Sequence, residues 1–574
     1  MRHQSLWRAT LLVALAIVAL TGGAFAQLQS GNLYGSAADQ DGSPLPGVTV
    51  TLKGGAGTQT QVTDAQGQFR FIGLDPGSYS IDATLDGFST VSHPNLTVNV
   101  GRSTSIELVL QAAITDTITI TSESPLLDAR KITAGNTIDK LEMEKIPTAR
   151  DPWAVLQSTP GVLTDRINVG GNESGQQALY VGPGAQCDQS TWALDGVTIT
   201  DMSATGSSPG YYDFDSFEEM QVSTGGSDIT QMAPGVALNM VTKRGTNDWR
   251  GSARYLVSDD SQQSDLSFDA GDLGKPGPWN NNSGQASFKQ GNRIVKVEDW
   301  GAEIGGPIVR DRVWIWGSYA KPTIDLLTVS DFQDLSTLEE TNVKLNAQAT
   351  PSNSVVLSGW ESDKVKIGRN AGPLRPQETT WDQSKFGPSP TSWKAEDTQV
   401  FGPSFLLTGM VSKVNGGFVL APHIAGNTQI AFLDDNGVLH NNSPANIEIL
   451  RPQEQAKLDG STFFNTGSVA HELKFGAGYR EAEQTSLSQT IGGAFEQGVG
   501  DDTSLYILAR DSRVNVSTDY TNLYVQDTLS MGNLTANVGV RYDKQGGENL
   551  ATQAAANRFR EDFNAVRDQV ARVV

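Results

Sequence analysis

The fold of this chain is most constrained by segments in which apolar and polar residues alternate strictly. In residues 533–544, NLTANVGVRYDK, one face carries Leu534, Ala536, Val538, Val540 and Tyr542. The opposite face carries Thr535, Asn537, Gly539, Arg541 and Asp543. A strand of about ten residues with one apolar and one polar face is typical of a transmembrane β-barrel. Residues 471–480, HELKFGAGYR, repeat the pattern, so these segments predict barrel strands.

The N-terminus predicts a secretory signal peptide over residues 1–26. Arg2 and Arg8 supply positive charge, residues 11–20 form the apolar run, and residues 24–26 (AFA) fit a cleavage site. The apolar run is much shorter than the roughly 20 residues that a membrane-spanning helix needs. No other run in the sequence approaches that length. A membrane-integral form of the chain is therefore expected to be a barrel, because only helices and closed barrels satisfy their backbone in lipid.

Composition excludes one class of partner. The chain has 42 Lys and Arg against 64 Asp and Glu, a net charge of -22. A nucleic-acid partner is not expected, because binding phosphate requires a basic surface. Cys187 is the only cysteine, so no intrachain disulfide forms, and we expect it to be a small buried residue. The 60 glycines and recurrent turn residues favour a mainly β fold.

Residues 27–112 predict a small antiparallel β-sandwich. Val48, Val50 and Leu52 alternate with threonines, and Ile106 and Leu108 flank Glu107. Period-two alternation with frequent Gly, Pro and Asp turns indicates short strands packed as two sheets.

Three motifs in this segment carry a resemblance. PLPGV, TDAQGQF and PGSY occur in this order and resemble the carboxypeptidase regulatory-like domain, which implies a transthyretin-like or carbohydrate-binding-like fold. Peptidase activity is not expected, since zinc binding there needs a His-x-x-Glu pair. No histidine in the chain has Glu three positions later: His3, His93, His423, His440 and His471. We interpret the domain as an accessory module and leave open whether it binds glycan.

Residues 113–125 link this domain to the next one. The run DTITIT, comprising Asp116, Thr117, Ile118, Thr119, Ile120 and Thr121, resembles the TonB box. The resemblance implies pairing with a strand of TonB, the periplasmic energy transducer, in which backbone hydrogen bonds provide most of the affinity. The alternative interpretation is an ordinary linker strand.

Residues 126–245 resemble the plug domain of TonB-dependent outer-membrane receptors. The resemblance rests on LDGV (194–197), FEEMQV (217–222) and NMVTK (239–243) in this order. The segments RDPW, TPGV, NVGG and GSSPGYYDFDSFEE, in this order, resemble Oar-like TonB-dependent receptors, in which a regulatory-like domain precedes the plug. A helix is expected near residues 151–157, because Asp caps a helix and Pro152 suits its first turn.

The resemblance implies that loops of the plug face an external ligand. The candidate ligand-facing residues lie in NVGG and in the loop after GSSPG: Asn168, Gly170, Gly171, Tyr211, Tyr212 and Asp213.

A plug requires a barrel, and residues 246–574 are expected to supply only part of one. Plugged outer-membrane transporters have 22 strands. Allowing roughly 25 residues for each strand and its connections, this segment supplies roughly a dozen. We therefore expect an α+β plug inside a partial antiparallel transmembrane barrel that is C-terminally incomplete. Trp314 and Trp316 are expected either in an interfacial girdle or against the lumen.

Catalytic motifs are weak. Residues 206–210, GSSPG, match G-x-S-x-G, but a nucleophile elbow needs a helix directly after the serine, and Pro209 stands there instead. Neither a phosphate loop nor a zinc-ligand spacing is found in the sequence. We expect no catalytic residue, no metal site, no cofactor and no enzymatic activity.

The sequence thus predicts an outer-membrane TonB-dependent receptor or transporter with its N-terminal domain in the periplasm. Its expected partners are TonB, an external ligand that the sequence does not identify, and outer-membrane lipid. The alternative is a surface protein for adhesion, glycan binding or export, in which the β-sandwich is the binding module. The location of the β-sandwich distinguishes the two hypotheses. A TonB-dependent receptor would hold it in the periplasm, whereas an adhesin would expose it outside the cell.

Overall fold

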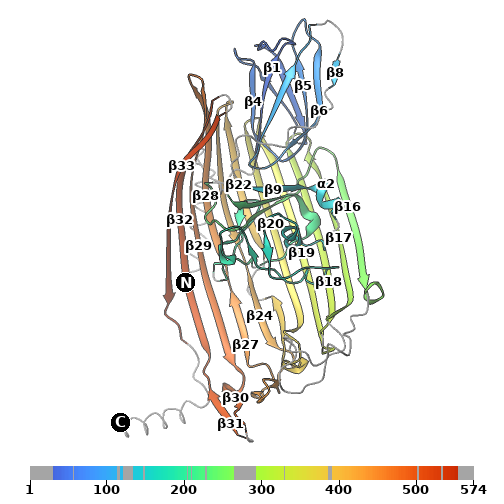
Figure 1. Cartoon of the computed structure of the whole chain (residues 1–574), viewed down its shortest axis with the longest axis vertical. Helices are drawn as coiled ribbons and strands as arrows, with labels where there is room; N and C mark the ends of the chain where they lie inside the picture. The colour runs from blue at the N-terminus through green and yellow to red at the C-terminus, as the bar shows by residue number, and fades with distance from the viewer. Residues whose placement is uncertain are drawn as a thin grey trace.

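The computed structural model describes residues 30–55, 57–112, 117–119, 134–146, 149–202, 204–208, 210–225, 229–263, 292–328, 330–385, 391–500, 503–531 and 534–553. The N-terminal signal segment and residues 554–574 lie outside these ranges. Figure 1 shows three parts: a small β-sandwich, a large curved sheet, and a compact plug on the inner side of that sheet. We call the large sheet the wall.

The sandwich consists of two facing sheets. The first has the order β4 (Gln68–Leu74), β1 (Gly31–Ala38), β7 (Ser103–Val109). The second has the order β3 (Gly57–Val62), β2 (Thr49–Gly54), β5 (Gly77–Thr84), β6 (Thr90–Val98), β8 (Thr117–Thr119). The predicted alternation is confirmed, because Val48, Val50, Leu52 and Leu108 all lie in the buried core between the sheets.

The plug combines one mixed sheet with short helices. Its sheet has the order β13 (Val197–Thr198), β12 (Thr191–Leu194), β15 (Ala237–Thr242), β14 (Phe217–Gly225), β9 (Ala134–Asp139). Its other elements are α2 (Lys140–Lys145), α3 (Pro152–Gln157), β10 (Leu163–Thr164), β11 (Tyr180–Val181), η1 (Cys187–Gln189) and η2 (Phe214–Ser216). Helix α3 begins where predicted, because the Asp151 carboxylate accepts a hydrogen bond from Trp153 N at 2.8 Å and Pro152 occupies the first turn.

The wall is a 14-stranded sheet in which neighbouring strands run antiparallel. Its strands are β16 (Arg250–Asp259), β17 (Arg293–Val309), β18 (Val313–Leu327), β19 (Gln333–Thr350), β20 (Asn353–Arg369), β21 (Trp381–Lys385), β22 (Ser392–Phe401), β23 (Phe405–Val414), β24 (Gly417–Pro422), β27 (Ala445–Leu450), β28 (Gln453–Thr466), β29 (Val469–Thr490), β32 (Ser512–Met531) and β33 (Leu534–Leu550). In the described strands, β16 and β33 are the two edges of the wall and do not pair with each other.

The two ends of the wall differ in their connections. Tight turns join β17 to β18, β19 to β20 and β28 to β29 at the end that carries the sandwich, which we call the tight-turn end. Longer segments join β24 to β27 and β29 to β32 at the opposite, long-loop end. The long-loop segments carry a separate sheet with the order β26 (Leu439–His440), β25 (Ala431–Leu433), β30 (Ala494–Gly498), β31 (Ser504–Leu508). Three 3-10 turns lie in connections of the wall: η3 (Asp260–Gln262) follows β16, η4 (Gln377–Thr379) follows β20, and η5 (Ile491–Gly493) follows β29.

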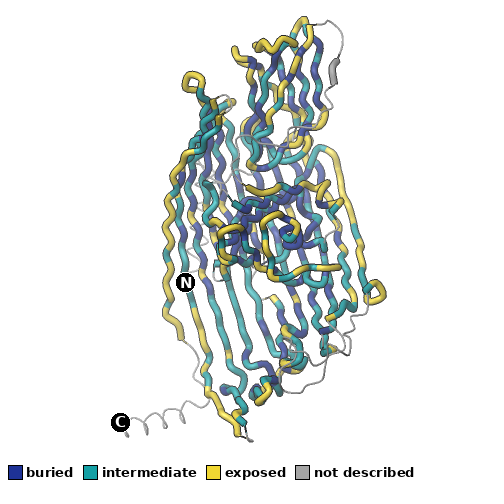
Figure 2. The backbone as a smooth tube through the Cα atoms, in the orientation of Figure 1, coloured by how far each residue is buried: buried dark blue, intermediate teal, exposed yellow. Residues whose placement is uncertain are grey.

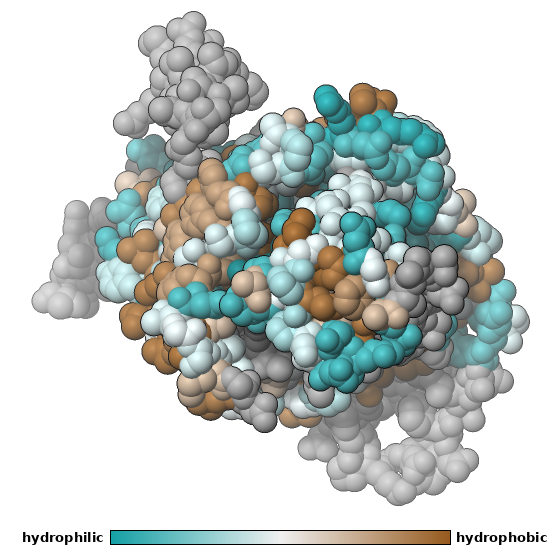
Figure 3. Space-filling view, turned by 90° about the horizontal axis from the view of Figure 1, so that it is seen from above, coloured by the Kyte–Doolittle hydropathy of each residue, from teal (hydrophilic) through white to brown (hydrophobic). Residues whose placement is uncertain are grey.

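The wall has the two faces that the sequence predicts. Val538, Val540 and Tyr542 are exposed on its outer face, whereas Arg480 of β29 is buried toward the plug. Figure 2 shows buried residues concentrated in the plug and in the wall beside it. Figure 3, seen from the sandwich end, shows hydrophobic side chains gathered toward the left of the view and hydrophilic ones toward the upper right. In the described residues, no helix has the length and apolarity to cross a membrane.

The structure decides the position of the two tryptophans of β18. Trp314 and Trp316 are 2% and 3% exposed and face the inside of the wall. Trp314 Nε1 donates to Asn247 at 2.8 Å, and Trp316 Nε1 donates to Glu303 at 3.1 Å. Their buried N–H groups thus have partners, and neither ring belongs to an outer girdle.

Candidate functional site

The plug is held to the wall by a buried polar node at Asp195. This residue lies in the tight turn between β12 and β13, with φ of 47° at Asp195 and 75° at Gly196. Asp tolerates this left-handed backbone better than most residues, which explains the Asp-Gly pair. The carboxylate accepts hydrogen bonds from Thr242 N at 3.0 Å and Thr242 Oγ1 at 2.7 Å, so the turn is fixed to β15.

Two lysines of the wall reach the same turn. Lys344 Nζ lies 2.8 Å from Asp195 Oδ2 and also donates to Thr242 O at 3.0 Å. Lys394 Nζ donates to the backbone oxygen of Asp195 at 2.8 Å. Burial opposes ionisation, but Lys344 and Lys394 together hold the pKa of Asp195 below its ordinary value. The node is therefore an ionised contact between the plug and two different wall strands.

Further wall side chains bind the backbone of β13. Gln455 accepts from Thr198 N at 3.1 Å and donates to Thr198 O at 2.6 Å, which mimics the pairing of a neighbouring strand. Lys457 Nζ donates to Gly196 O at 2.7 Å, and Gln453 donates to Thr200 O at 3.1 Å. Backbone groups of the plug edge are thus satisfied by side chains of β28, and water replaces such bonds at small net cost.

A second contact between plug and wall is rich in carboxylates. Arg254 of β16 lies 2.7 Å from Asp213, 2.9 Å from Asp215 and 2.8 Å from Asp299. Arg150 also pairs with Asp215. The guanidinium fork suits several carboxylates at once. Burial raises the pKa of Asp213, and Arg254 opposes that rise.

Beside this cluster lies a small cavity of about 40 Å³ that Asp151, Arg254, Asp299 and Glu340 help to line. Glu340 is 2% exposed, and its Oε2 has no hydrogen-bond partner in the structure. Burial raises the pKa of Asp151 to about 8. The region thus holds more carboxyl groups than cations, and buried carboxyls in such surroundings favour the protonated form.

The NVGG loop of the plug lies against the long-loop end of wall strand β17. Gly170 is exposed, as are Ile167 and Val169 beside it. A Cβ on Gly170 would lie 3.5 Å from Ile294, which is at the long-loop end of β17. Asn168 is half-buried, and its side chain donates to Ser174 at 3.0 Å and accepts from Glu173 N at 3.1 Å.

Gly171 differs from its neighbour. It is buried, and a Cβ there would approach Val297 at 3.0 Å with φ at 89°. Glycine at this position therefore allows the loop to approach the wall closely, which is a packing role.

The second predicted loop is directed at the wall. Tyr212 and Asp213 are 7% and 3% exposed, and Tyr211 is half-buried. Tyr211 N donates to Ser362 at 2.6 Å, and Lys364 Nζ donates to Tyr211 Oη at 3.0 Å. These contacts fit an anchoring role in the plug better than contact with a ligand.

The segment that resembles the TonB box is described only at Thr117–Thr119. These residues form β8, which pairs parallel to β6 at the edge of the sandwich, with Ile118 opposite Val91. Asp116, Ile120 and Thr121 lie outside the described residues. A three-residue strand offers few backbone hydrogen bonds, so this pairing contributes little to the stability of the sandwich.

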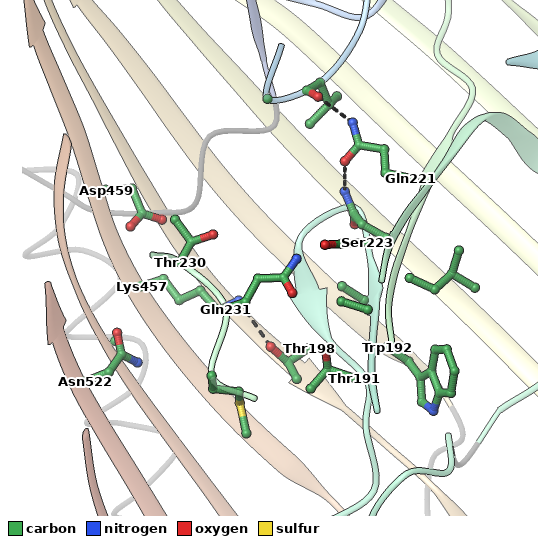
Figure 4. Close-up of a pocket in the computed structure, with 18 of the residues that line it drawn as sticks. Thr191, Trp192, Thr198, Gln221, Ser223, Thr230, Gln231, Lys457, Asp459 and Asn522 are labelled. Atoms are coloured by element: carbon green, nitrogen blue, oxygen red, sulfur yellow. Dashed lines mark hydrogen bonds between the residues drawn. The ribbon is translucent and has the colours of Figure 1, made fainter. Parts of the chain in front are cut away.

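A cavity at the plug–wall junction has a volume of about 210 Å³. The lining comes from the sandwich turn at Val100, from plug strands β9, β12, β14 and β15, and from wall strands β28, β29, β32 and β33. Figure 4 shows Lys457 and Asp459 of β28 facing Thr198, Thr230 and Gln231 of the plug. A space of this size with polar side chains in its lining is large enough to hold water.

The G-x-S-x-G match does not form a nucleophile elbow. Ser208 N donates to Gln177 at 2.9 Å, and the next described element is η2, well downstream of the serine. Pro209 lies outside the described residues. Within the described part of the chain, no group of His, Cys, Asp and Glu has the arrangement to hold a metal ion.

Sequence reasoning missed the wall side chains that hold the plug. They are Lys344, Lys364, Lys394, Gln455, Lys457 and Arg480. The available signal was a long cationic or amide side chain at an inward position of an alternating strand, as Lys394 is in SWKAED. Alternation predicts on which face of a wall strand a side chain lies. The plug residue that this side chain binds becomes known only from the folded structure.

Comparisons with known proteins agree with this architecture. The family model of the carboxypeptidase regulatory-like domain matches residues 32–111. Over 319 residues the chain is 25% identical to the TonB-dependent transporter Oar of Myxococcus xanthus, covering 51% of this chain and 28% of that protein. The chain therefore spans less than a third of the length of this curated relative.

Solved structures show the same fold. The outer membrane transporter YddB from Escherichia coli matches with a TM-score of 0.53 and 13% identity, covering 72% of this chain and 57% of that one. The ferripyoverdine receptor of the outer membrane of Pseudomonas aeruginosa matches with a TM-score of 0.53 and 12% identity, covering 80% and 59%. The fold is that of plugged outer-membrane receptor barrels, preceded here by a regulatory-like β-sandwich. The chain is similar to the TonB-dependent transporter Oar in sequence, and its wall and plug are similar to those of solved outer-membrane receptors in fold.

Proposed function

We propose that this chain is the plug-bearing part of a TonB-dependent receptor that moves a ligand across the outer membrane into the periplasm. The observation that carries the proposal is a plug held on the inner side of the wall by buried polar contacts. Lys344 and Lys394 converge on Asp195, while Gln455 and Lys457 bind the neighbouring backbone. Apolar packing contributes as well, since Trp360, Met410 and Val414 of the wall join the hydrophobic core of the plug. The polar contacts differ in that they can be exchanged for hydrogen bonds to water when the plug moves.

The proposed orientation follows from the connections of the wall. Outer-membrane barrels have short periplasmic turns and longer extracellular loops. The tight-turn end, which carries the sandwich, therefore faces the periplasm in this proposal. TonB would then reach residues 116–121 from the same side as the sandwich, and ligand would approach Asn168 and Gly170 from the long-loop side.

TonB is proposed to pair with residues 116–121 by strand addition. Thr117–Thr119 already adopt an extended strand at a sheet edge. Strand addition uses backbone hydrogen bonds, so it requires little of the side chains in the added segment. The short, repetitive sequence of residues 116–121 fits this role. The proposed transport function requires no catalytic residue. The curated relative is likewise described as a transporter.

The test is transport in cells with and without TonB. Because the ligand is not identified, the probes are ferric siderophores, vitamin B12, and fluorescent oligosaccharides and peptides, each assayed in isogenic strains that carry or lack the gene for this chain. The proposal expects accumulation of at least one probe that requires both the chain and TonB. Accumulation that requires the chain but is unchanged by TonB loss would rule out energised transport.

The alternative, a surface adhesion, glycan-binding or export protein, makes a different demand on the sandwich. Adhesion would need residues 30–112 on the cell exterior, whereas the proposed orientation puts them in the periplasm. Protease added to whole cells distinguishes the two, since only an external sandwich is cleaved while the outer membrane is intact. Binding of residues 27–112 to a glycan array would favour the alternative.

A further inference from the structure

The sandwich touches both the wall and the plug, and the two contacts differ in chemistry. Its contact with the wall is an apolar cluster in which Tyr34 and Ile72 pack against Leu406 and Phe463. All four side chains are at least nine-tenths buried. The Tyr34 and Phe463 rings lie edge to face at 6.0 Å, and the Arg70 guanidinium lies 4.9 Å from the Phe463 ring.

A second contact of the sandwich is with the segment that joins plug strand β15 to wall strand β16. Asp75 forms an ion pair with Arg244, near the plug end of this segment. Gly55 lies against Thr246, and the neighbouring Asn247 donates to Asp311 in the tight turn between β17 and β18 at 2.7 Å. The sandwich is therefore held at the tight-turn end by the apolar cluster and, beside Thr246, by a segment that is hydrogen-bonded to the wall.

The contact with the plug is polar and centres on Glu219 of β14. Its carboxylate accepts hydrogen bonds from Asn99 Nδ2 at 2.7 Å and from Val100 N at 3.0 Å, both in the sandwich. Gln221, two residues along the same strand, donates to Val100 O and to Glu219 at 2.8 Å. Burial raises the pKa of Glu219, and these donors oppose the rise.

The two contacts respond differently to separation in water. Separating the apolar cluster exposes aromatic and aliphatic surface, and nothing in water compensates for that. When Glu219 separates from Asn99 and Val100, its two hydrogen bonds to them are exchanged for hydrogen bonds to water. The net loss of free energy is therefore smaller than for the apolar cluster. The weaker contact under load is therefore the one between sandwich and plug.

Chain topology directs a pull at residues 117–119 to this weaker contact. The segment is attached on one side to β7 of the sandwich and on the other side to β9 of the plug. Strand β9 pairs with β14, and Asp139 lies opposite Glu219 itself. If residues 117–119 are pulled while the sandwich stays bound to the wall, the force acts on the plug through β9. It is then borne by the pairing of β9 with β14, beside the Glu219 contact.

We propose that the sandwich is a fixed anchor on the wall and that Glu219 is the contact at which the plug separates from it. The inference rests on the proposed function only in requiring that the plug moves. During that movement the sandwich stays at Leu406, Phe463 and Thr246, and β14 leaves Asn99 and Val100. Glu219 is a positioning residue that holds the resting plug against the anchor.

Force measurement on the full chain in a lipid bilayer tests this without a ligand. A peptide handle is inserted after Thr119 and pulled at constant force from the tight-turn side, in a Cys187→Ser background. Glu219→Ala is expected to shorten the lifetime of the plug contact about tenfold, whereas Glu218→Ala on the same strand is the matched control. Equal lifetimes for the two variants would overturn the role of Glu219.

A disulfide tests the anchor itself. A Cβ at residue 55 would lie 3.7 Å from Thr246 Cβ, which suits a disulfide in Gly55→Cys/Thr246→Cys. We expect the same lifetime and the same released chain length in the oxidised and reduced protein, because the sandwich does not leave the wall. A longer lifetime or shorter released length after oxidation would show that the sandwich leaves, and would overturn the proposal. Failure of transport in cells, by contrast, bears on the proposed function and not on this result.

Discussion

Lys344 of β19 and Asp195 of the plug form an ion pair with 2.8 Å between Nζ and Oδ2, and their side chains are 2% and 8% exposed. Because Lys394 binds the backbone oxygen of the same aspartate, one turn of the plug is held by two wall strands. Breaking such a pair leaves a buried charge without its partner, which is more costly than the pair itself is favourable. The Asp195 turn is thus a contact with the wall whose stability depends on keeping both partners.

Asp195→Ala is therefore expected to destabilise the seated plug by roughly 3–5 kcal/mol. The measurement is the temperature at which trypsin begins to cleave the plug in outer-membrane vesicles. Lys53→Ala is the matched control, since Lys53 pairs with Asp82 at 2.8 Å but is 56% exposed, and exposed pairs contribute roughly 0–1 kcal/mol. A shift for Asp195→Ala no larger than that of the control would contradict the prediction.

The Asp195 contact also shows which features of the plug and the wall can be predicted from the sequence and which cannot. Alternation in NLTANVGVRYDK and HELKFGAGYR predicts wall strands and their outward faces, because period two follows directly from strand geometry. The LDG turn is recognisable from Asp and Gly alone. Its ion pair with Lys344 is not, because the two residues are distant in sequence and meet only when the plug lies inside the wall.

The same limit explains the loop at Tyr211–Asp213. Tyrosines and an aspartate after a Gly-rich stretch are typical of an exposed binding loop. The structure instead directs them at Ser362, Lys364 and Arg254 of the wall. A polar side chain that faces a polar wall interior is indistinguishable, in sequence, from one that faces solvent.

Adjacent residues of β32 test which face of the wall meets lipid. Val525 is 44% exposed on the outer face, whereas Gln526 faces inward and donates to Asn537 at 3.4 Å. Val525→Arg is expected to cost up to about 2–4 kcal/mol, depending on depth in the bilayer, and Gln526→Arg much less. The readout is the fraction of protein that resists urea extraction from outer membranes. A larger loss for Gln526→Arg would reverse the assignment of faces.

Asp151 predicts a pH dependence of plug stability. Burial raises its pKa from 3.8 to about 8, so the folded plug retains a proton that the unfolded chain releases near pH 4. The folded state therefore binds more protons between about pH 4 and 8, and stability falls as pH rises through this range, by at most about 1.4 kcal/mol per unit. Asp195, whose pKa is lowered, has the opposite sign and loses its contribution only in acid.

Asp151→Asn isolates this effect, because asparagine also caps a helix and has no proton to lose. Trypsin cleavage of the plug on heating, measured at pH 5 and pH 8, is expected to occur at a lower temperature at pH 8 in the natural sequence. The two pH values are expected to give closer temperatures in Asp151→Asn. An unchanged pH dependence in this variant would assign the effect to another group.

Strand β8 gives the most direct test of the proposed coupling to TonB. Proline lacks an N–H and cannot donate to a strand ladder, so Ile118→Pro is expected to abolish pairing with a TonB strand. Thr119→Ser keeps the backbone unchanged and is the matched control. Photo-cross-linking from residue 117 to TonB in cells is expected to disappear in Ile118→Pro and to persist in Thr119→Ser, while both variants reach the outer membrane in equal amounts. Cross-linking that survives Ile118→Pro would show that TonB does not bind this segment by strand addition.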